Sequence, residues 1–328
     1  MTDSNELVPV DVTLDPAEAG FVEAARAPST LRGYRSDWRE FTSWCADNDH
    51  QALPASDVAI SRYITALATA GAKTGTIARR LSSIRFAHKV RNQPDPTQTA
   101  RVATVWEGIR RTLGTHPDQA RPLMPPLLLD VLDACPHETS WKTRPNQQSL
   151  AGARDRALLL VGFVTALRPS ELAALTIEQI QPDDRGRIIT LTHSKTNQTG
   201  KPEHLIIPWG SRQETCPITA LDHWLTLAGI TTGPALRGVT KGNRPTGRAL
   251  SSDGLSKLVT AAVARAGFDP TGYSGHSLRA GFATYAVKRG ATAQQVAHQT
   301  RHKALSSVGI YTRIENAWED NAALRLGL

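Results

Sequence analysis

The chain has 328 residues, of which 40% are hydrophobic and 21% charged, a composition that fits about two folded domains and excludes wholesale disorder. Its longest uncharged apolar stretch, 157–167, is shorter than the ~20 residues of a membrane span, so we expect no membrane association. Three widely spaced cysteines exclude a disulfide scaffold and indicate a reducing, cytoplasmic location.

The charge is strongly positive, with 38 Lys and Arg against 30 Asp and Glu. Residues 1–20 hold five acidic residues and no basic one, so the rest of the chain is more basic than this total. A folded body of this charge indicates a polyanionic partner, most simply nucleic acid. Charge alone leaves open the alternative that these residues serve only solubility.

Residues 1–20 are expected to be a flexible acidic tail, and 21–113 a compact domain of four amphipathic helices. Apolar residues recur there at spacings of three and four. The expected helices cover about 31–45, 56–70, 76–91 and 97–113. Ser29 or Thr30 is the expected N-cap of the first helix, and Ser56 that of the second.

The basic side chains of the first and third of these helices lie largely off the apolar stripes. Two basic flanks in one small domain predict a surface that contacts DNA phosphates. The alternative for either flank alone is a solvated face. The predicted DNA-binding residues are Arg32, Arg35, Arg39, Arg79, Arg80, Arg85 and Lys89.

Residues 114–126 are rich in glycine and proline and are predicted to be a linker. The remaining domain, 127–328, is mixed. Strands are expected at 186–192 and 204–209, joined by a polar hairpin tip at 194–201. The expected helices cover about 126–134, 154–167, 217–228, 252–266, 277–289, 292–299, 304–312 and 317–325.

Several polar residues of this domain lie beside apolar or tightly turning segments. Arg168 ends the apolar run and needs an anionic partner, for which an internal pair with Glu171 is the simplest candidate. Glu171 also falls in the first turn of the next helix, where its charge favours the helix dipole. His276 and Arg279, three residues apart, lie on one helix face.

His302 lies at a turn between two expected helices, and Tyr311 follows nine residues later. Together with Lys195 in the hairpin tip, these residues suit phosphate chemistry: arginines bind phosphate oxygens, histidine transfers protons, and tyrosine can act as a nucleophile. His298 and His302 have the spacing of a zinc pair, but no suitable third ligand is evident, so no metal is predicted.

The segments TALRPSEL, HSKTNQ, HSLRAGFAT and TRHKALSSVGIY, in this order, resemble the motifs of the tyrosine recombinase (phage integrase) family. TLRGYRSDWREFTSWC and TIARRLSSIRFAHKV resemble its core-binding domain. The resemblance covers most of the chain. It implies a mainly α fold, with a SAM-like helical core-binding domain and an α+β catalytic domain containing a small β-hairpin or sheet. The sequence departs from the pattern at Arg301, where the family usually has glycine.

This resemblance implies a site-specific DNA recombinase in which Tyr311 attacks a phosphodiester and forms a 3′-phosphotyrosine intermediate. Arg168 and Arg279 would hold the nonbridging oxygens with help from His302. Lys195 would protonate the departing 5′-oxygen, and His276 is the candidate base. No cofactor, metal ion or ATP is expected. The alternatives are an enzyme that nicks and reseals one duplex, like a type IB topoisomerase, and an inactive DNA-binding relative.

The expected partner is double-stranded DNA, with the two domains closing around the duplex. The short N-terminal tail favours a system of the Cre or Xer kind. In this family a C-terminal helix docks on a neighbouring subunit, and the amphipathic segment near 317–326 therefore suggests a tetramer on two DNA sites. The sequence indicates neither the target DNA nor whether the outcome is integration, excision, resolution or inversion.

Overall fold

The computed structural model describes residues 26–115, 119–139, 147–192 and 202–302, together with Leu305, Gly309 and Leu326. The chain divides into two compact units, Met1–Asp118 and Gln119–Leu328. This division falls inside the segment 114–126 that the sequence predicts as a linker. The expected hairpin tip and the two expected C-terminal helices lie outside the described residues, apart from those three single positions.

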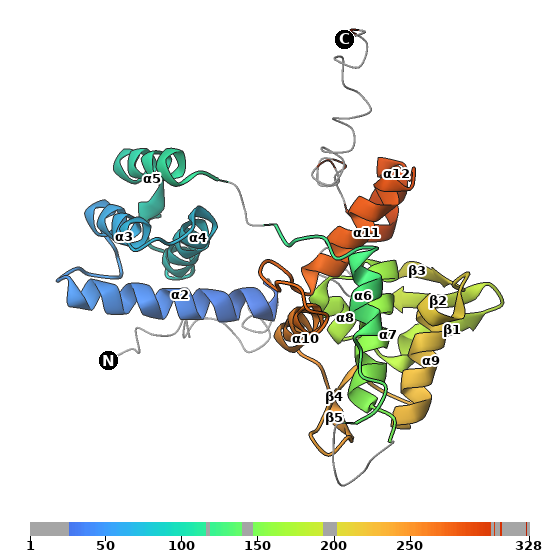
Figure 1. Cartoon of the computed structure of the whole chain (residues 1–328). Coiled ribbons are helices and arrows are strands. Elements are labelled where there is room, and N and C mark those ends of the chain that lie inside the picture. Colours follow the sequence, from blue (N-terminus) through green and yellow to red (C-terminus); the bar gives the residue numbers. More distant parts are fainter. Residues whose placement is uncertain are drawn as a thin grey trace. The chain divides into compact units, whose positions relative to one another are not determined.

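In its described part, the first unit contains four α-helices, α2 (Pro28–Asp47), α3 (Asp57–Thr69), α4 (Thr74–Val90) and α5 (Ala100–Leu113), with a short 3₁₀ turn, η1 (Pro96–Gln98), before α5 (Figure 1). Ser56 caps α3 as expected, accepting a hydrogen bond from the backbone of Ala59. The expected cap of the first helix is wrong. The helix begins at Pro28, which suits a first helical position because proline has no N–H to satisfy.

The core of this unit is aromatic and aliphatic, with Trp38, Phe41 and Ile60 almost fully buried. His88 lies inside it. Its Nε2 accepts a hydrogen bond from the Ala55 backbone at 2.9 Å, and its Nδ1–H donates to the Ile84 carbonyl at 2.8 Å. Burial lowers the pKa of His88, so the imidazole is neutral and joins α4 to the turn before α3.

The second unit has seven α-helices in its described part, around one large core. They are α6 (Leu127–Asp133), α7 (Leu150–Thr165), α8 (Pro169–Ala173), α9 (Pro217–Ala228), α10 (Ser252–Arg265), α11 (His276–Lys288) and α12 (Ala293–Thr300). The apolar run of the sequence makes α7 the central helix, which packs against α9, α10, α11 and β3 (Figure 1). Its residues Leu158 to Val161 are 0–4% exposed.

Two antiparallel sheets complete the described part of this unit. The larger has the order β1 (Ile180–Asp183), β2 (Gly186–Leu191), β3 (Glu203–Pro208), and the smaller pairs β4 (Arg237–Val239) with β5 (Pro245–Ala249). The last residue of β2, Leu191, pairs with the first of β3, Glu203. The expected strands correspond to β2 and β3. Strands β1, β4 and β5 were not expected, because they are short and carry no alternating apolar pattern. The mainly helical fold with small sheets is confirmed.

The second half of the predicted linker belongs to the core of this unit. Leu123 is fully buried, and its N–H donates to the Ser277 carbonyl of α11 at 2.9 Å. Gly281 makes this close approach possible, because a Cβ at that position would lie 2.0 Å from the Leu123 carbonyl oxygen. No helix within the described ranges is long and apolar enough to cross a membrane.

Candidate active site

Arg168 stands at the junction of α7 and α8. It is the N-cap residue of α8, and its backbone N–H donates to Glu171 Oε2 at 2.9 Å. Its Nη1 donates to Glu171 Oε1, also at 2.9 Å. The internal pair that the sequence left open is therefore present, and Glu171 fixes both ends of Arg168.

Arg279 lies on α11 and is 5% exposed. Its Nη1 donates to the Ala166 carbonyl at 2.7 Å, and its Nη2 donates to His302 Nε2 at 3.0 Å. Ala166 has a left-handed backbone, with φ 49°, at the end of α7. The guanidinium is thus held between the end of α7 and the turn after α12.

His302 is neutral, and its hydrogen bonds fix its tautomer. Because arginine has only donors, Nε2 must accept from Arg279, which leaves the proton on Nδ1 for the bond to Thr300 Oγ1 at 2.8 Å. The Thr300 hydroxyl in turn donates a hydrogen bond to the Val296 carbonyl at 2.6 Å. Burial, with smaller effects of the charges on Arg279 and Arg168, lowers the pKa of His302 to about 4.

Arg301 precedes His302 and ends α12 in the left-handed region, with φ 55°. Its side chain is only 8% exposed and pairs with Glu171 and with Glu203, the latter at 3.1 Å. Glu171 therefore forms ion pairs with both Arg168 and Arg301. Burial acts to raise the pKa of Glu171, but the charges on Arg301 and Arg168 outweigh it, so the pKa is lowered and the carboxylate is ionised.

The structure brings together three of the six predicted catalytic residues: Arg168, Arg279 and His302. His276 is the first residue of α11, one turn from Arg279, and is exposed. Lys195 and Tyr311 lie outside the described residues. Sequence reasoning missed Glu203, because its contact with Arg301 spans 98 positions and leaves no local signal.

The predicted DNA-binding cations of the first unit are of two kinds. Arg32, Arg35 and Arg39 on α2 and Lys89 on α4 are exposed and available for an outside partner.

The others are engaged within the unit. Arg80 donates to the Tyr63 hydroxyl at 2.7 Å and pairs with Glu40, and its side chain is 16% exposed. Arg79 pairs with the buried Asp37 at 2.7 Å, and Arg85 pairs with Asp95 at 2.9 Å, yet both arginine side chains stay half exposed.

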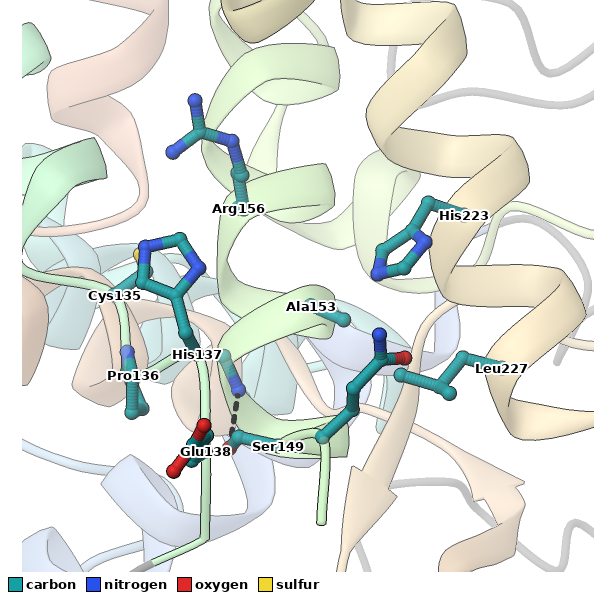
Figure 2. Close-up of a pocket in the computed structure, with 11 residues that line it drawn as sticks. Cys135, Pro136, His137, Glu138, Ser149, Ala153, Arg156, His223 and Leu227 are labelled. Carbon is teal, nitrogen blue, oxygen red and sulfur yellow. Dashed lines mark hydrogen bonds between the residues drawn. The ribbon is translucent and has the colours of Figure 1, made fainter. Parts of the chain in front are cut away.

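Within the described ranges no group of three or more His, Cys, Asp or Glu residues could hold a metal ion. A separate cavity of about 250 Å³ lies near α7 and α9, and none of the three assembled residues lines it. Figure 2 shows His223 on α9 and His137 on the segment after α6 at its edge. Arg156, also at this cavity, donates to the backbone carbonyls of Leu132 and Glu214.

Comparison with known proteins matches residues 142–317 to the phage integrase family and 21–91 to its N-terminal SAM-like domain. The chain belongs to the phage integrase family. A relative, the integrase/recombinase XerD homolog of Selenomonas ruminantium, is 34% identical over 311 residues, covering 93% of this chain and 87% of that protein. The resemblance stated from the motifs is confirmed, and the chain is a tyrosine recombinase, an enzyme of site-specific DNA recombination.

Solved structures show the same fold. The XerH site-specific recombinase in its post-cleavage complex with difH aligns with a TM-score of 0.64 at 16% identity, covering 94% of this chain and 82% of that one. A lambda integrase fragment bound as a dimer to a core site aligns with a TM-score of 0.58 at 18% identity, covering 89% and 91%.

Proposed function

We propose that this recombinase cuts and rejoins DNA through a covalent 3′-phosphotyrosine on Tyr311, with Arg168, Arg279 and His302 forming the anion-binding part of its active site. The observation that carries the proposal is the buried Arg279 guanidinium, held by Ala166 and His302. The family's motif residues thus meet where two cations can stabilise a phosphate. The comparisons give no support to the alternative of a topoisomerase-like or inactive relative.

In the cleavage step the Tyr311 oxygen attacks phosphorus and the bond from phosphorus to the 5′-oxygen breaks. The guanidinium groups of Arg168 and Arg279 hold the nonbridging oxygens, where negative charge grows in the transition state. Lys195 supplies the proton that the 5′-oxygen takes up, and His276 accepts the proton of the tyrosine. Rejoining is the reverse, with the 5′-hydroxyl of another strand as the nucleophile.

Neutral His302 has a supporting role in this scheme. Its Nε2 accepts from Arg279, while its Nδ1–H is engaged by Thr300. The imidazole therefore orients the guanidinium without adding a charge of its own. A second link, from Gln299 Nε2 to the Val164 carbonyl at 3.0 Å, ties α12 to the end of α7 and keeps this turn in place.

The substrate is double-stranded DNA, as it is the type of ligand in the aligned XerH and lambda integrase complexes. We propose that the exposed Arg32, Arg35, Arg39 and Lys89 contact DNA phosphates, and that the half-exposed Arg79 and Arg85 add to this charge. Contacts of this kind position a protein on the duplex without reading its sequence.

A tetramer on two DNA sites is the proposed assembly, with the C-terminal segment 317–326 as the contact between subunits. We also propose a cytoplasmic location. It is supported by the three cysteines, Cys45, Cys135 and Cys216, which are buried free thiols as expected in a reducing compartment.

The decisive experiment is incubation of the protein with nicked suicide duplexes from its genetic neighbourhood, followed by mapping of the DNA-linked peptide. We expect one adduct, at Tyr311, on the 3′-phosphate side of the cut. An adduct at another residue, or cleavage without any covalent complex, would contradict the proposal.

A further inference from the structure

Arg301 occupies a backbone position that favours glycine. Its φ of 55° lies in the left-handed region, which an arginine enters only against a steric penalty. The residue therefore has to be held there by its surroundings. Its guanidinium supplies the holding contacts, because it is almost buried and lies between two carboxylates.

Each carboxylate belongs to a different element around the site. Glu171, on α8, also binds the backbone and the side chain of Arg168. Glu203 is the first residue of β3. The residue that follows Arg301 in the chain is His302, which binds Arg279. Arg301 thus joins α8, β3 and the turn after α12, and two of these three carry groups that the proposed mechanism uses.

We propose that Arg301 is a positioning residue for strand cleavage, a strut whose guanidinium fixes Arg168 through Glu171 and holds the His302 turn against β3. The inference rests on the proposed function for its effect on cleavage. The existence of the strut does not depend on the proposed function, because the coupling between its ion-paired residues can be measured without DNA. Such a role explains why an arginine is held at a left-handed backbone position that favours glycine.

A cavity of about 490 Å³ beside Arg301 makes the proposal testable by chemical rescue. It is lined by Glu203, His298, Arg301 and His302, together with His204, Gln294 and Ala297. In an Arg301→Gly variant, the two carboxylates face the space left by the side chain. A guanidinium ion from solution can then reach the carboxylates through the cavity. Its charge and shape match those of the missing arginine head group.

The main experiment compares Arg301→Gly with the unaltered protein. Single-turnover formation of the covalent complex is measured on a nicked suicide duplex at saturating protein, alongside DNA affinity and the melting temperature. We expect the cleavage rate to fall by about tenfold or more, since small displacements of catalytic groups have effects of this size, with DNA affinity unchanged. Millimolar guanidinium chloride should restore part of the rate with saturation, and equal sodium chloride should not.

Thermal stability separates positioning from general damage. Glycine relieves the backbone strain while the two ion pairs are lost, so the melting temperature of Arg301→Gly should change little. A wild-type cleavage rate in this variant would overturn the proposal. So would a loss that guanidinium does not restore, or one matched by an equal loss of DNA affinity.

Glu203→Gln supplies a second variant in case Arg301→Gly fails to fold. Its side chain is 32% exposed, so the fold tolerates the change, and only one arm of the strut is removed. We expect a smaller loss of cleavage than for Arg301→Gly and no further loss in the double variant. Additive losses would contradict a shared strut. The matched control is Asp222→Asn, which removes the 2.9 Å ion pair between α9 and Arg187 of the same sheet and should leave cleavage unchanged.

The two proposals fail in different ways. If the unaltered protein forms no adduct, the proposed function is wrong. The strut is then judged by a double-mutant cycle of Arg301→Gly and Glu203→Gln on thermal unfolding, which needs no activity. A zero coupling energy in that cycle would reject the strut even if the adduct at Tyr311 is found.

Discussion

Arg279 donates a hydrogen bond to His302 across 3.0 Å, and this bond exists only while the imidazole is unprotonated. A proton on Nε2 would place two cationic groups face to face. Burial lowers the pKa of His302 to about 4, and the charge on Arg279 acts in the same direction. The geometry of the Arg279 side chain therefore depends on the charge state of His302.

The first prediction concerns stability against pH. The pKa of His302 falls from 6.5 to about 4 on folding, so the unfolded chain takes up a proton before the folded one does. Its contribution to stability is complete above pH 6.5 and is lost as the pH falls towards 4. Melting temperatures across this window should fall less steeply for His302→Gln, which can still accept from Arg279. The exposed His298→Gln should follow the unaltered protein, and identical slopes for all three would refute this account.

The second prediction concerns Arg279→Lys. A lysine keeps the charge but cannot donate to Ala166 and His302 in the fixed geometry of a guanidinium. Single-turnover cleavage should drop by about 10²-fold or more, as for other lost donors to a transition state. Arg289→Lys, an exposed position at the end of the same helix, is the matched control and should cleave normally. Normal cleavage by Arg279→Lys would exclude Arg279 from the anion-binding part of the active site.

The third prediction concerns the nucleophile. Tyr311→Phe removes the attacking oxygen and should abolish covalent attachment to DNA while leaving the binding constant unchanged. The measurement is a denaturing gel of the protein–DNA adduct with a parallel binding titration. Tyr285→Phe, in the same unit, should retain the adduct. An undiminished adduct in Tyr311→Phe would show that another residue attacks.

The fourth prediction separates DNA contacts from internal pairs in the first unit. Arg32→Ala and Arg39→Ala should weaken binding on every duplex and reduce the slope of log K against log salt by about one each. Arg80→Ala should instead lower the melting temperature, because it leaves Tyr63 and Glu40 without their partner. Fluorescence anisotropy over a salt series distinguishes them, and an unchanged slope in the α2 variants would remove α2 from the interface.

The fifth prediction concerns metal ions. If Arg168 and Arg279 neutralise the phosphate, cleavage of the suicide duplex should proceed at its full rate in excess EDTA. If EDTA lowers the cleavage rate and added Mg²⁺ restores it, a divalent cation takes part in neutralising the phosphate.

Much of the fold could be predicted because the helices have strong periodic patterns. The apolar stripe that includes Trp38 and Phe41 predicted α2, and Ser56 predicted the start of α3. The apolar run before Arg168 gave the central helix. The short strands could not be predicted: β1 is Ile-Gln-Pro-Asp, in which one apolar residue and a proline carry no alternating signal.

Part of the candidate site could be predicted from the sequence. Arg168, Arg279 and His302 came from motif order, and Glu171 from its place in a helical first turn. The partners that fix their function could not be predicted, because they meet over long distances in the chain. Arg301 reaches Glu171 across 130 positions, and Arg279 reaches Ala166 across 113. The pairing of Arg80 with Glu40 and Tyr63 could not be predicted for the same reason, since these contacts are tertiary.

The buried position of Leu123 has a practical consequence for dissecting this enzyme. A fragment that starts at residue 127, where the sequence alone would divide the chain, lacks Leu123, whose backbone lies against Gly281. It would expose the helix bearing Arg279 along the face that Leu123 now seals. A catalytic half that begins at Gln119 is slightly longer and keeps this contact, so it is the fragment that we expect to remain folded.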